Sequence, residues 1–291
     1  MTGFGSDVVS TLRRAPRALL AGVALLTLVV AFALSAPLWG SPTHQDLTNG
    51  LTSSGLPRPA GSGGYPLGTD QLGRDQAARL AYGARVSLTV ALVANVTSLL
   101  IGALVGVIAG FYGGVTEQLL MRFTDMGLSL PTTLIALVIA ALMSSGIIRV
   151  VVIVTALFWS YPARLVYGET LRLRRRGFVE AAEASGARGA TVIRRHLLPH
   201  LSPLIMTYFP LNAVSAVLFE AGISFLGAGI NPPTASWGNM VSDGESAISY
   251  APHLIIEPSV CLMITTMAFL LLGEGLKALN PETARVSWLT V

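Results

Sequence analysis

Glu220 and Glu257 are acidic residues that lie in otherwise apolar runs of the chain. A carboxyl group at membrane depth is costly, so such a residue marks either a substrate pathway or a buried structural hydrogen bond. Both interpretations stay open for Glu220, which has apolar neighbours, and any counter-charge must come from another loop or subunit. Glu257 lies near the start of its run, where contact with solvent is expected. Both acids are candidates for a substrate pathway.

A second group of chemically informative residues lies in the basic segment 169–200. The stretch from Glu180 to Gly186 is typical of a short helix followed by a turn, because glycine adopts the left-handed conformation that ends helices. A second short helix is expected to end at Pro199. Three alanines add little bulk here, and Glu180 and Glu183 suit a first turn that faces a positive partner. The segment is either a docking surface or a solvated connector.

The composition indicates what kind of protein positions these residues. Of the 291 residues, 52% are hydrophobic and 12% are charged, and the mean hydropathy is +0.65. A soluble fold cannot cover so much apolar surface with so few charges, so we expect an all-α membrane protein. The net charge of +4 does not indicate nucleic acid, because the basic residues cluster beside the apolar runs. Cys261 is the only cysteine, and no metal-ligand spacing is present.

Charge-poor runs of about 20 residues predict six transmembrane helices. The expected spans are 18–38, 86–111, 125–149, 149–164, 203–227 and 254–276, so that 86–276 forms a core of five spans. The first run is longer than the apolar core of a secretory signal peptide, which favours a retained helix over a cleaved signal. The fourth run is short, so Arg149 and Arg164 are expected to extend towards lipid headgroups.

The distribution of arginine and lysine predicts that both termini are cytoplasmic. With six spans, thirteen basic residues lie on the inner side and five on the outer side. The segments 1–17, 169–200 and 277–291 are then cytoplasmic, and the loops 39–85 and 228–253 are external. The arginine-rich stretch 172–176 would meet anionic headgroups.

Small residues and prolines predict how the spans pack. In the second span, small residues recur every four positions: Ser98, Gly102, Gly106 and Gly110. This spacing places them on one helical face and lets another backbone approach closely. Pro131 and Pro210 each remove a backbone donor, so each is expected to kink its helix or to mark a discontinuity.

The segment 180–199 resembles the E-A-A-x3-G signature, continued by L-P, of permease subunits in bacterial ABC importers. The matching residues are Glu180, Ala181, Ala182, Gly186, Leu198 and Pro199. His196 replaces an apolar residue, which is a common variant. Residues 67–85 and 220–238 are similar to segments of the dipeptide, oligopeptide and nickel permeases. The likeness covers most of the chain from residue 66 onward and is greatest to the second permease subunit of dipeptide-type systems.

The resemblance implies the architecture of a type I ABC importer permease in the bacterial plasma (inner) membrane. Such a chain forms half of a translocation pathway for dipeptides or short peptides, beside a second homologous permease. Two ATPase subunits, or one fused ATPase, would use ATP and Mg and dock on the coupling segment 180–199, including His196. An external substrate-binding protein would deliver the peptide.

The resemblance also makes the external loops candidates for contact with the binding protein, through Asp70, Arg74, Asp75 and Trp237. Structural capping of the outer pore is the alternative for these residues. The chain has no G-x-x-x-x-G-K-[ST] phosphate loop, so we expect neither an ATPase site nor a cofactor in it.

Other functions stay open beside peptide import. Nickel and haem importers share these motifs. An ion-driven secondary transporter would work without ATPase subunits, but it usually has inverted repeats, and no clear repeat is visible. An intramembrane enzyme would need catalytic or metal-binding side chains at membrane depth. The histidines all lie outside the expected spans, at His44, His196, His200 and His253.

Overall fold

The structure is a computed structural model that describes residues 16–279. Within this range the chain is helical, with three isolated β-bridges in the loop 40–75 and no strand. The all-helical fold that the composition predicted is therefore confirmed. The predicted cytoplasmic segments 1–17 and 277–291 lie mostly outside the described residues.

The helices follow one another along the chain with few long connections. They are α2 (Arg17–Leu34), α3 (Gln76–Tyr112), α4 (Gly114–Ser129), α5 (Thr132–Leu142), α6 (Ile147–Phe158), α7 (Ser160–Arg174), α8 (Gly177–Ala184), α9 (Gly189–Val192), α10 (Leu198–Phe225), α11 (Trp237–Glu245) and α12 (His253–Leu279). A 3-10 turn (Ala36–Trp39) follows α2, and a π-helical turn (Ile193–Leu197) precedes α10. In the described part of the chain, five helical segments are long and apolar enough to cross a membrane, and the number is six if the bent pair α4–α5 is counted as one span.

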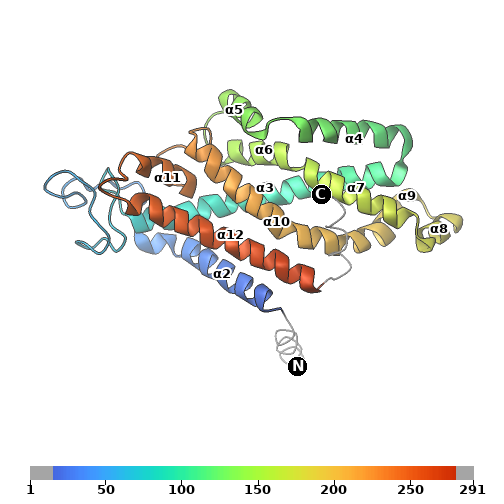
Figure 1. The fold of residues 1–291 in the computed structure, drawn as a ribbon, viewed down its shortest axis with the longest axis horizontal. Coiled ribbons are helices and arrows are strands. Elements are labelled where there is room, and N and C mark those ends of the chain that lie inside the picture. Colours follow the sequence, from blue (N-terminus) through green and yellow to red (C-terminus); the bar gives the residue numbers. More distant parts are fainter. Residues whose placement is uncertain (1–15, 280–291) are drawn as a thin grey trace, which may run out of the picture.

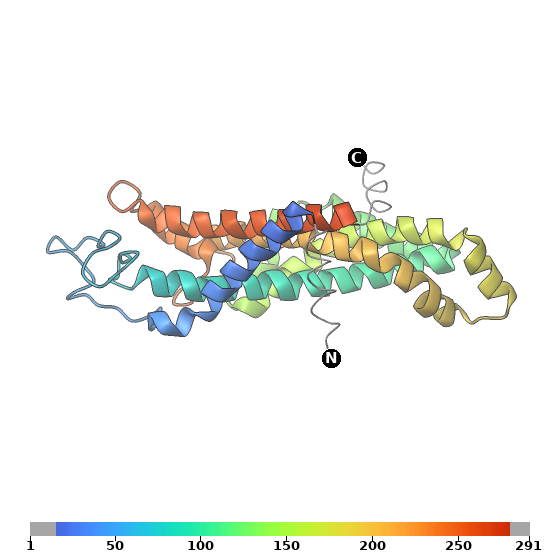
Figure 2. The same cartoon turned by 90° about the horizontal axis from the view of Figure 1, so that it is seen from below.

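The long helices lie side by side in an elongated bundle (Figures 1 and 2). Helix α2 packs against α12, while α3 packs along α7 and α10. Helix α11 and the loop 40–75 lie at one end of the bundle, and α8 and α9 lie at the other (Figure 1). We call residues 36–75 and 226–252 the α11 end, and residues 175–197 the α8 end.

Close packing of α3 on α7 explains the small residues of the second predicted span. A Cβ atom added at Gly102 would lie 2.5 Å from the carbonyl oxygen of Trp159, and one added at Gly106 would lie 2.5 Å from that of Ala163. Two backbones this close leave no room for side chains. Ser98 belongs to the contact of α3 with α10 rather than to that with α7. Its hydroxyl accepts a hydrogen bond from Asn212 of α10 at 3.4 Å.

The third predicted span, 125–149, is not one helix. Helices α4 and α5 meet at 92°, and Leu130 between them has an extended backbone. Pro131 accounts for the break, because the residue before a proline is kept out of the helical conformation. Helix α5 has 11 residues and so a length of about 16 Å, roughly half of a bilayer core. Pro210, by contrast, lies inside the continuous helix α10.

The fourth predicted span also differs, because α6 and α7 together run well past the expected limit at residue 164. The expectation that Arg149 extends to the headgroups is wrong, since its side chain is buried. Its guanidinium donates to the carbonyl oxygens of Ala140 at 3.3 Å, Met143 at 3.4 Å and Gly229. Backbone carbonyl oxygens near the C-terminal end of a helix have no hydrogen-bond donor within the helix. At the end of α5, the Arg149 guanidinium is the donor that they lack.

Helix α3 begins at Gln76 rather than at residue 86, so the predicted external loop 39–85 is helical in its last part. The Asp75 carboxylate caps this helix by accepting a hydrogen bond from the Ala77 amide at 2.9 Å. A charged side chain in the first turns of a helix is compatible with the helix when its charge is paired or hydrogen-bonded. Arg85 does so by donating to the carbonyl oxygen of Ala33 at 2.7 Å.

Candidate functional site

The first candidate site is the α8 end, where α8 ends in the glycine turn that the sequence predicted. Gly186 has a φ of 79°, and its amide donates to the Glu183 carbonyl oxygen at 2.9 Å. The amide of Ala187 donates to the Ala182 carbonyl oxygen at 3.1 Å. These two bonds form a Schellman motif, which requires a left-handed residue and so favours glycine. The space beside Gly186 is open, with no atom within 4 Å of an added Cβ.

Helix α8 has one face packed on the bundle and one face free. Val179 is fully buried in a core cluster with residues of α3, α7 and α10. The ring of Phe178 stacks on that of His200, with centroids 4.7 Å apart. On the other face, Glu180 and Ala181 are exposed. Helix α8 therefore presents small side chains and a carboxylate on its exposed face, while its opposite face packs on the bundle.

The second half of the segment joins a spanning helix directly. Helix α9 runs into the π-helical turn and then into α10, so Leu198 and Pro199 begin α10. The expectation that Pro199 ends a short helix is wrong, because a proline in a first turn needs no N–H donor and fits there. His196 is half-buried, with its ring 6.4 Å from that of Phe178, while Leu198 and Pro199 are exposed.

Positive charge surrounds α8. The exposed arginines before and after it are Arg172, Arg174, Arg175, Arg176, Arg188, Arg194 and Arg195. The guanidinium of Arg174 also lies over the Phe111 ring, 5.8 Å from its centroid. The basic character that predicted a cytoplasmic position for this segment is therefore a property of its surface.

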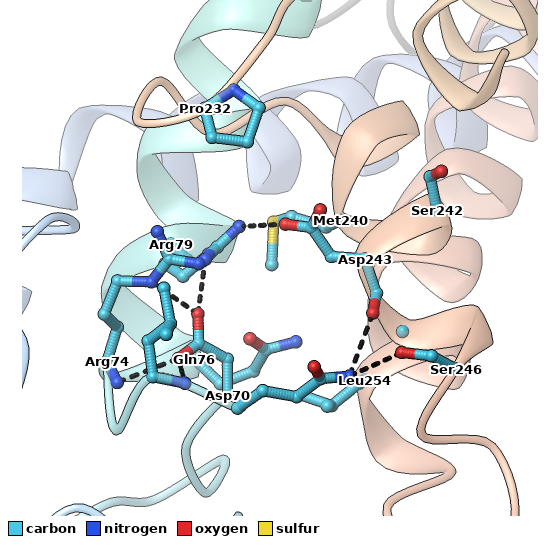
Figure 3. Close-up of a pocket in the computed structure, with 13 residues that line it drawn as sticks. Asp70, Arg74, Gln76, Arg79, Pro232, Met240, Ser242, Asp243, Ser246 and Leu254 are labelled. Atoms are coloured by element: carbon cyan, nitrogen blue, oxygen red, sulfur yellow. Dashed lines mark hydrogen bonds and ion pairs between the residues drawn. The ribbon is translucent and has the colours of Figure 1, made fainter. Parts of the chain in front are cut away.

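The second candidate site is an ion-pair network at the α11 end (Figure 3). Asp70 accepts hydrogen bonds from Arg74 Nε at 2.6 Å and from Arg79. Arg79 also donates to Asp243 Oδ2 at 2.9 Å, which links the start of α3 to α11. The four side chains border a cavity of about 410 Å³. They bring together two parts of the chain that are far apart in the sequence, residues 70–79 and Asp243.

The acidic groups of this end differ in their electrostatic surroundings. Burial raises the pKa of Asp243 above its ordinary value, while the charge of Arg74 acts in the opposite direction. Burial also raises the pKa of Asp75, against hydrogen bonds from the amides that it caps. Asp46, in the exposed loop, has a lowered pKa, chiefly because the Asn49 amide donates to its carboxylate.

The four residues predicted to contact a binding protein offer that protein little surface. Asp70, Arg74 and Trp237 are buried, and Asp75 serves as the cap of α3. The indole Nε1 of Trp237 donates to the carbonyl oxygen of Leu80 at 3.1 Å. These contacts favour the alternative, structural capping of this end, and contact with a binding protein stays a prediction.

Of the two acids in apolar runs, Glu220 is fully buried and Glu257 is partly exposed. The Glu220 carboxylate accepts hydrogen bonds from Ser87 at 3.0 Å and from Ser224 at 2.9 Å. Neither acid borders the cavity of Figure 3. These contacts favour the structural interpretation of Glu220 over a role in lining a pathway.

Sequence reasoning missed several of the residues that organise these sites. Arg79 and Asp243 lie 164 positions apart, and nothing local pairs them. A weak signal was present for Asp70 and Arg74, because their i,i+4 spacing suits an ion pair. No group of three or more His, Cys, Asp or Glu that could hold a metal ion occurs within residues 16–279.

A family model described as "Binding-protein-dependent transport system inner membrane component" matches residues 102–281, which is more than half of the chain. The chain belongs to this family. The permease is therefore a membrane subunit of an ABC importer, and it crosses the plasma (inner) membrane several times. Such a subunit acts together with a partner permease, an ATPase and a binding protein. The matched region includes the α8 end, Arg149 and Glu220.

Individual relatives agree with this assignment. The permease is 34% identical to the oligopeptide transport system permease protein OppC of Haemophilus influenzae, over 91% of this chain and 85% of that protein. It is 37% identical to the glutathione transport system permease protein GsiD of Pectobacterium atrosepticum, over 76% of this chain and 74% of that protein.

Among solved structures, the MetNI methionine ABC transporter in an inward-facing conformation matches with a TM-score of 0.58 at 20% identity. The match covers 71% of this chain and 95% of that chain. At this identity the likeness concerns the fold alone, and it confirms the type I permease architecture.

Proposed function

We propose that this permease forms one half of a translocation pathway for short peptides and that ATPase subunits drive it through the α8 end. A second homologous permease supplies the other half of the pathway, and a binding protein delivers the peptide at the α11 end. The peptide substrate is supported by the relatives, which are named for oligopeptides and for glutathione, itself a tripeptide. ATP and Mg are used by the ATPase subunits.

The observation that carries this proposal is the free face of α8. Because Ala181 and Ala184 are small and exposed, a partner surface can approach the helix backbone. Helix α8 is also fixed to the bundle by Val179 and by the stack of Phe178 on His200. A displacement of α8 by an ATPase is therefore passed to α10, which spans the membrane. In this proposal the α8 end faces the cytoplasm.

The test uses the permease reconstituted with its partner permease, ATPase and binding protein in lipid vesicles. Glu180→Arg reverses the charge of the free face, and Glu274→Arg makes the same change at an exposed position of α12, outside the α8 end and the α11 end. We expect Glu180→Arg to lower ATP-driven uptake of a labelled tripeptide at least about tenfold, because a reversed charge at an interface costs several kcal/mol. The amount of permease in the vesicles should not change.

A second variant tests the turn that ends α8. Gly186→Val forces a branched side chain into a left-handed conformation, at a cost of roughly 1–3 kcal/mol, whereas Gly186→Asn is tolerated there better than other residues. We expect the valine variant to lose uptake and the asparagine variant to retain most of it. Normal uptake by both Glu180→Arg and Gly186→Val would contradict coupling through α8.

The rival functions give different results in the same vesicles. Peptide uptake that follows an ion gradient without ATP would favour an ion-driven transporter. Uptake of nickel or haem in place of peptide would retain the ATP-driven mechanism and contradict the substrate.

A further inference from the structure

A hairpin, residues 226–236, joins α10 to α11 and is held at its middle by Glu220. Ser224 Oγ donates to Glu220 Oε1 at 2.9 Å and accepts from the amide of Ile230 at 3.2 Å. The single proton of this hydroxyl is therefore donated to the carboxylate, while its oxygen accepts a hydrogen bond from a backbone amide of the hairpin. In this way Glu220 fixes the position of Ile230 through Ser224.

The other end of the hairpin is held by the same carboxylate through α3. Ser87 Oγ donates to Glu220 Oε2 at 3.0 Å and accepts from the amide of Trp237 at 3.4 Å. The two serines thus form matching relays, one from each carboxylate oxygen to one backbone amide. None of the hydrogen bonds described for Glu220 comes from a basic side chain, so neutral donors stabilise this fully buried acid.

The hairpin is stiff as well as anchored. Asn239 Nδ2 donates to the carbonyl oxygens of Ile230 at 3.1 Å and Thr234 at 2.7 Å, which closes the hairpin on itself. Helix α11 lies tightly on α10, because a Cβ added at Gly238 would lie 2.7 Å from Ala221 Cα. A stiff hairpin attached at two points, to α10 through Ser224 and to α3 through Ser87, moves with both helices.

We propose that Glu220 is a positioning residue for transport, which holds the hairpin 226–236 on α10 and the start of α11 on α3. The α11 end then follows α10 and α3 together when the spans move during the transport cycle. A carboxylate is needed because both of its oxygens must accept. The amide of Gln would turn its NH₂ group towards one serine, and the proton of that hydroxyl would lose its acceptor. The transport part of this inference rests on the proposed function, whereas the anchoring part does not.

The anchoring is tested in the purified complex by hydrogen exchange of the backbone amides. In Glu220→Gln we expect the amides of Ile230 and Trp237 to exchange about tenfold faster, because a serine hydroxyl loses its acceptor in the buried relay. Ser87→Ala should affect mainly the Trp237 amide, and Ser224→Ala mainly that of Ile230. Glu245→Gln makes the same chemical change on an exposed part of α11 and serves as the control.

The positioning role is tested by the number of ATP molecules hydrolysed for each tripeptide imported. A structural defect alone lowers the amount of folded complex and leaves this ratio unchanged. We expect Glu220→Gln to raise the ratio about tenfold, since the hairpin and the start of α11 no longer follow α10 and α3 while the α8 end is intact. Ser87→Ala, a smaller change, should raise it in the same direction if Glu220→Gln fails to assemble.

The exchange rates test the anchoring of the hairpin, and the ratio of ATP hydrolysed to tripeptide imported tests the role of Glu220 in transport. Unchanged exchange at Ile230 and Trp237 would overturn the anchoring. Faster exchange with an unchanged ratio would overturn the role in transport. Adding Ser87→Ala to Glu220→Gln should cause little further change, because both act on one relay, and fully additive effects would contradict the relay. Hydrogen exchange is measured without substrate. The anchoring can therefore be confirmed or contradicted even if the permease proves not to import peptides.

Discussion

The ring of Phe178 in α8 stacks on the ring of His200 in α10, with centroids 4.7 Å apart and planes inclined by 16°. The His200 ring is itself fixed, since its Nδ1 lies 2.6 Å from the carbonyl oxygen of His196. This contact is a lateral link between α8 and the first turn of a spanning helix. It complements the covalent path through α9.

The stack gives the first prediction. Phe178→Ala should weaken the attachment of α8 by about 1 kcal/mol for the ring pair, in addition to the lost burial. We expect faster hydrogen exchange in α8 and lower ATP-driven uptake, with Phe178→Tyr close to the wild type because it keeps the ring. Equal exchange in the alanine and tyrosine variants would show that the stack does not hold α8.

The packing of α3 on α7 gives the second prediction. Gly106→Ala should lower the midpoint of thermal unfolding in detergent, because the new Cβ would overlap the Ala163 carbonyl and overpacking costs about 1–3 kcal/mol. Gly168→Ala in α7 is the matched control, since no atom lies within 4 Å of its new Cβ. That variant should be neutral or more stable by up to about 1 kcal/mol. A stable Gly106→Ala variant would contradict the close approach of the two helices.

The third prediction compares a buried arginine with an exposed one. Arg79 is buried and donates to Asp70 and to the partly exposed Asp243, so Arg79→Gln should cost about 1.5–3 kcal/mol by removing hydrogen bonds between charged groups, although Asp70 keeps its pair with Arg74. Arg164 and Asp125 form an exposed pair, with 46% and 42% of their side chains accessible, and Arg164→Gln should cost less than about 1 kcal/mol. Thermal unfolding measures both. Similar losses in the two variants would refute the structural importance of the network.

The fourth prediction concerns pH and the loop at the α11 end. The Asp46 carboxylate accepts from the Asn49 amide at 2.7 Å and from the Tyr65 hydroxyl at 3.0 Å, and the amide bond is the main cause of its lowered pKa. A lowered pKa in the fold means that the ionised form stabilises the loop above the ordinary value of 3.8. This stabilisation is lost as the pH falls below that value.

Hydrogen exchange of residues 46–75, corrected for the intrinsic effect of pH, measures the change. We expect the wild-type loop to open on acidification below the ordinary aspartate value. Asp46→Asn should be more open at neutral pH and should show a smaller change with pH. An identical pH profile in the two proteins would assign the acid sensitivity to another group.

Features set by local sequence were predictable. The turn at Gly186 follows from one glycine after a short helical stretch, and the close packing of Gly102 and Gly106 follows from their four-residue spacing. Both depend on residues within one or two helical turns. The signature segment around Glu180 was recognised for the same reason, since its residues are adjacent in the chain.

Features that depend on contacts between distant segments were not predictable. Arg149 was expected at the headgroups because charged residues usually mark span limits, and its carbonyl partner at Gly229 lies 80 positions away. Asp70 and Trp237 were taken for surface residues, because loop residues are usually exposed. Their burial arises from an ion pair and an indole hydrogen bond that no single segment reveals.

The partners of Arg149 also set an order for biosynthesis. The carbonyl oxygens of Ala140 and Met143, at the end of α5, are satisfied by a side chain synthesised after them, and that side chain also needs Gly229. A nascent chain that has inserted α5 and α6 therefore still carries an incompletely bonded guanidinium. The Arg149 guanidinium gains its contact with Gly229 only when the chain beyond α10 has been made, so the environment of this buried charge is completed late rather than helix by helix.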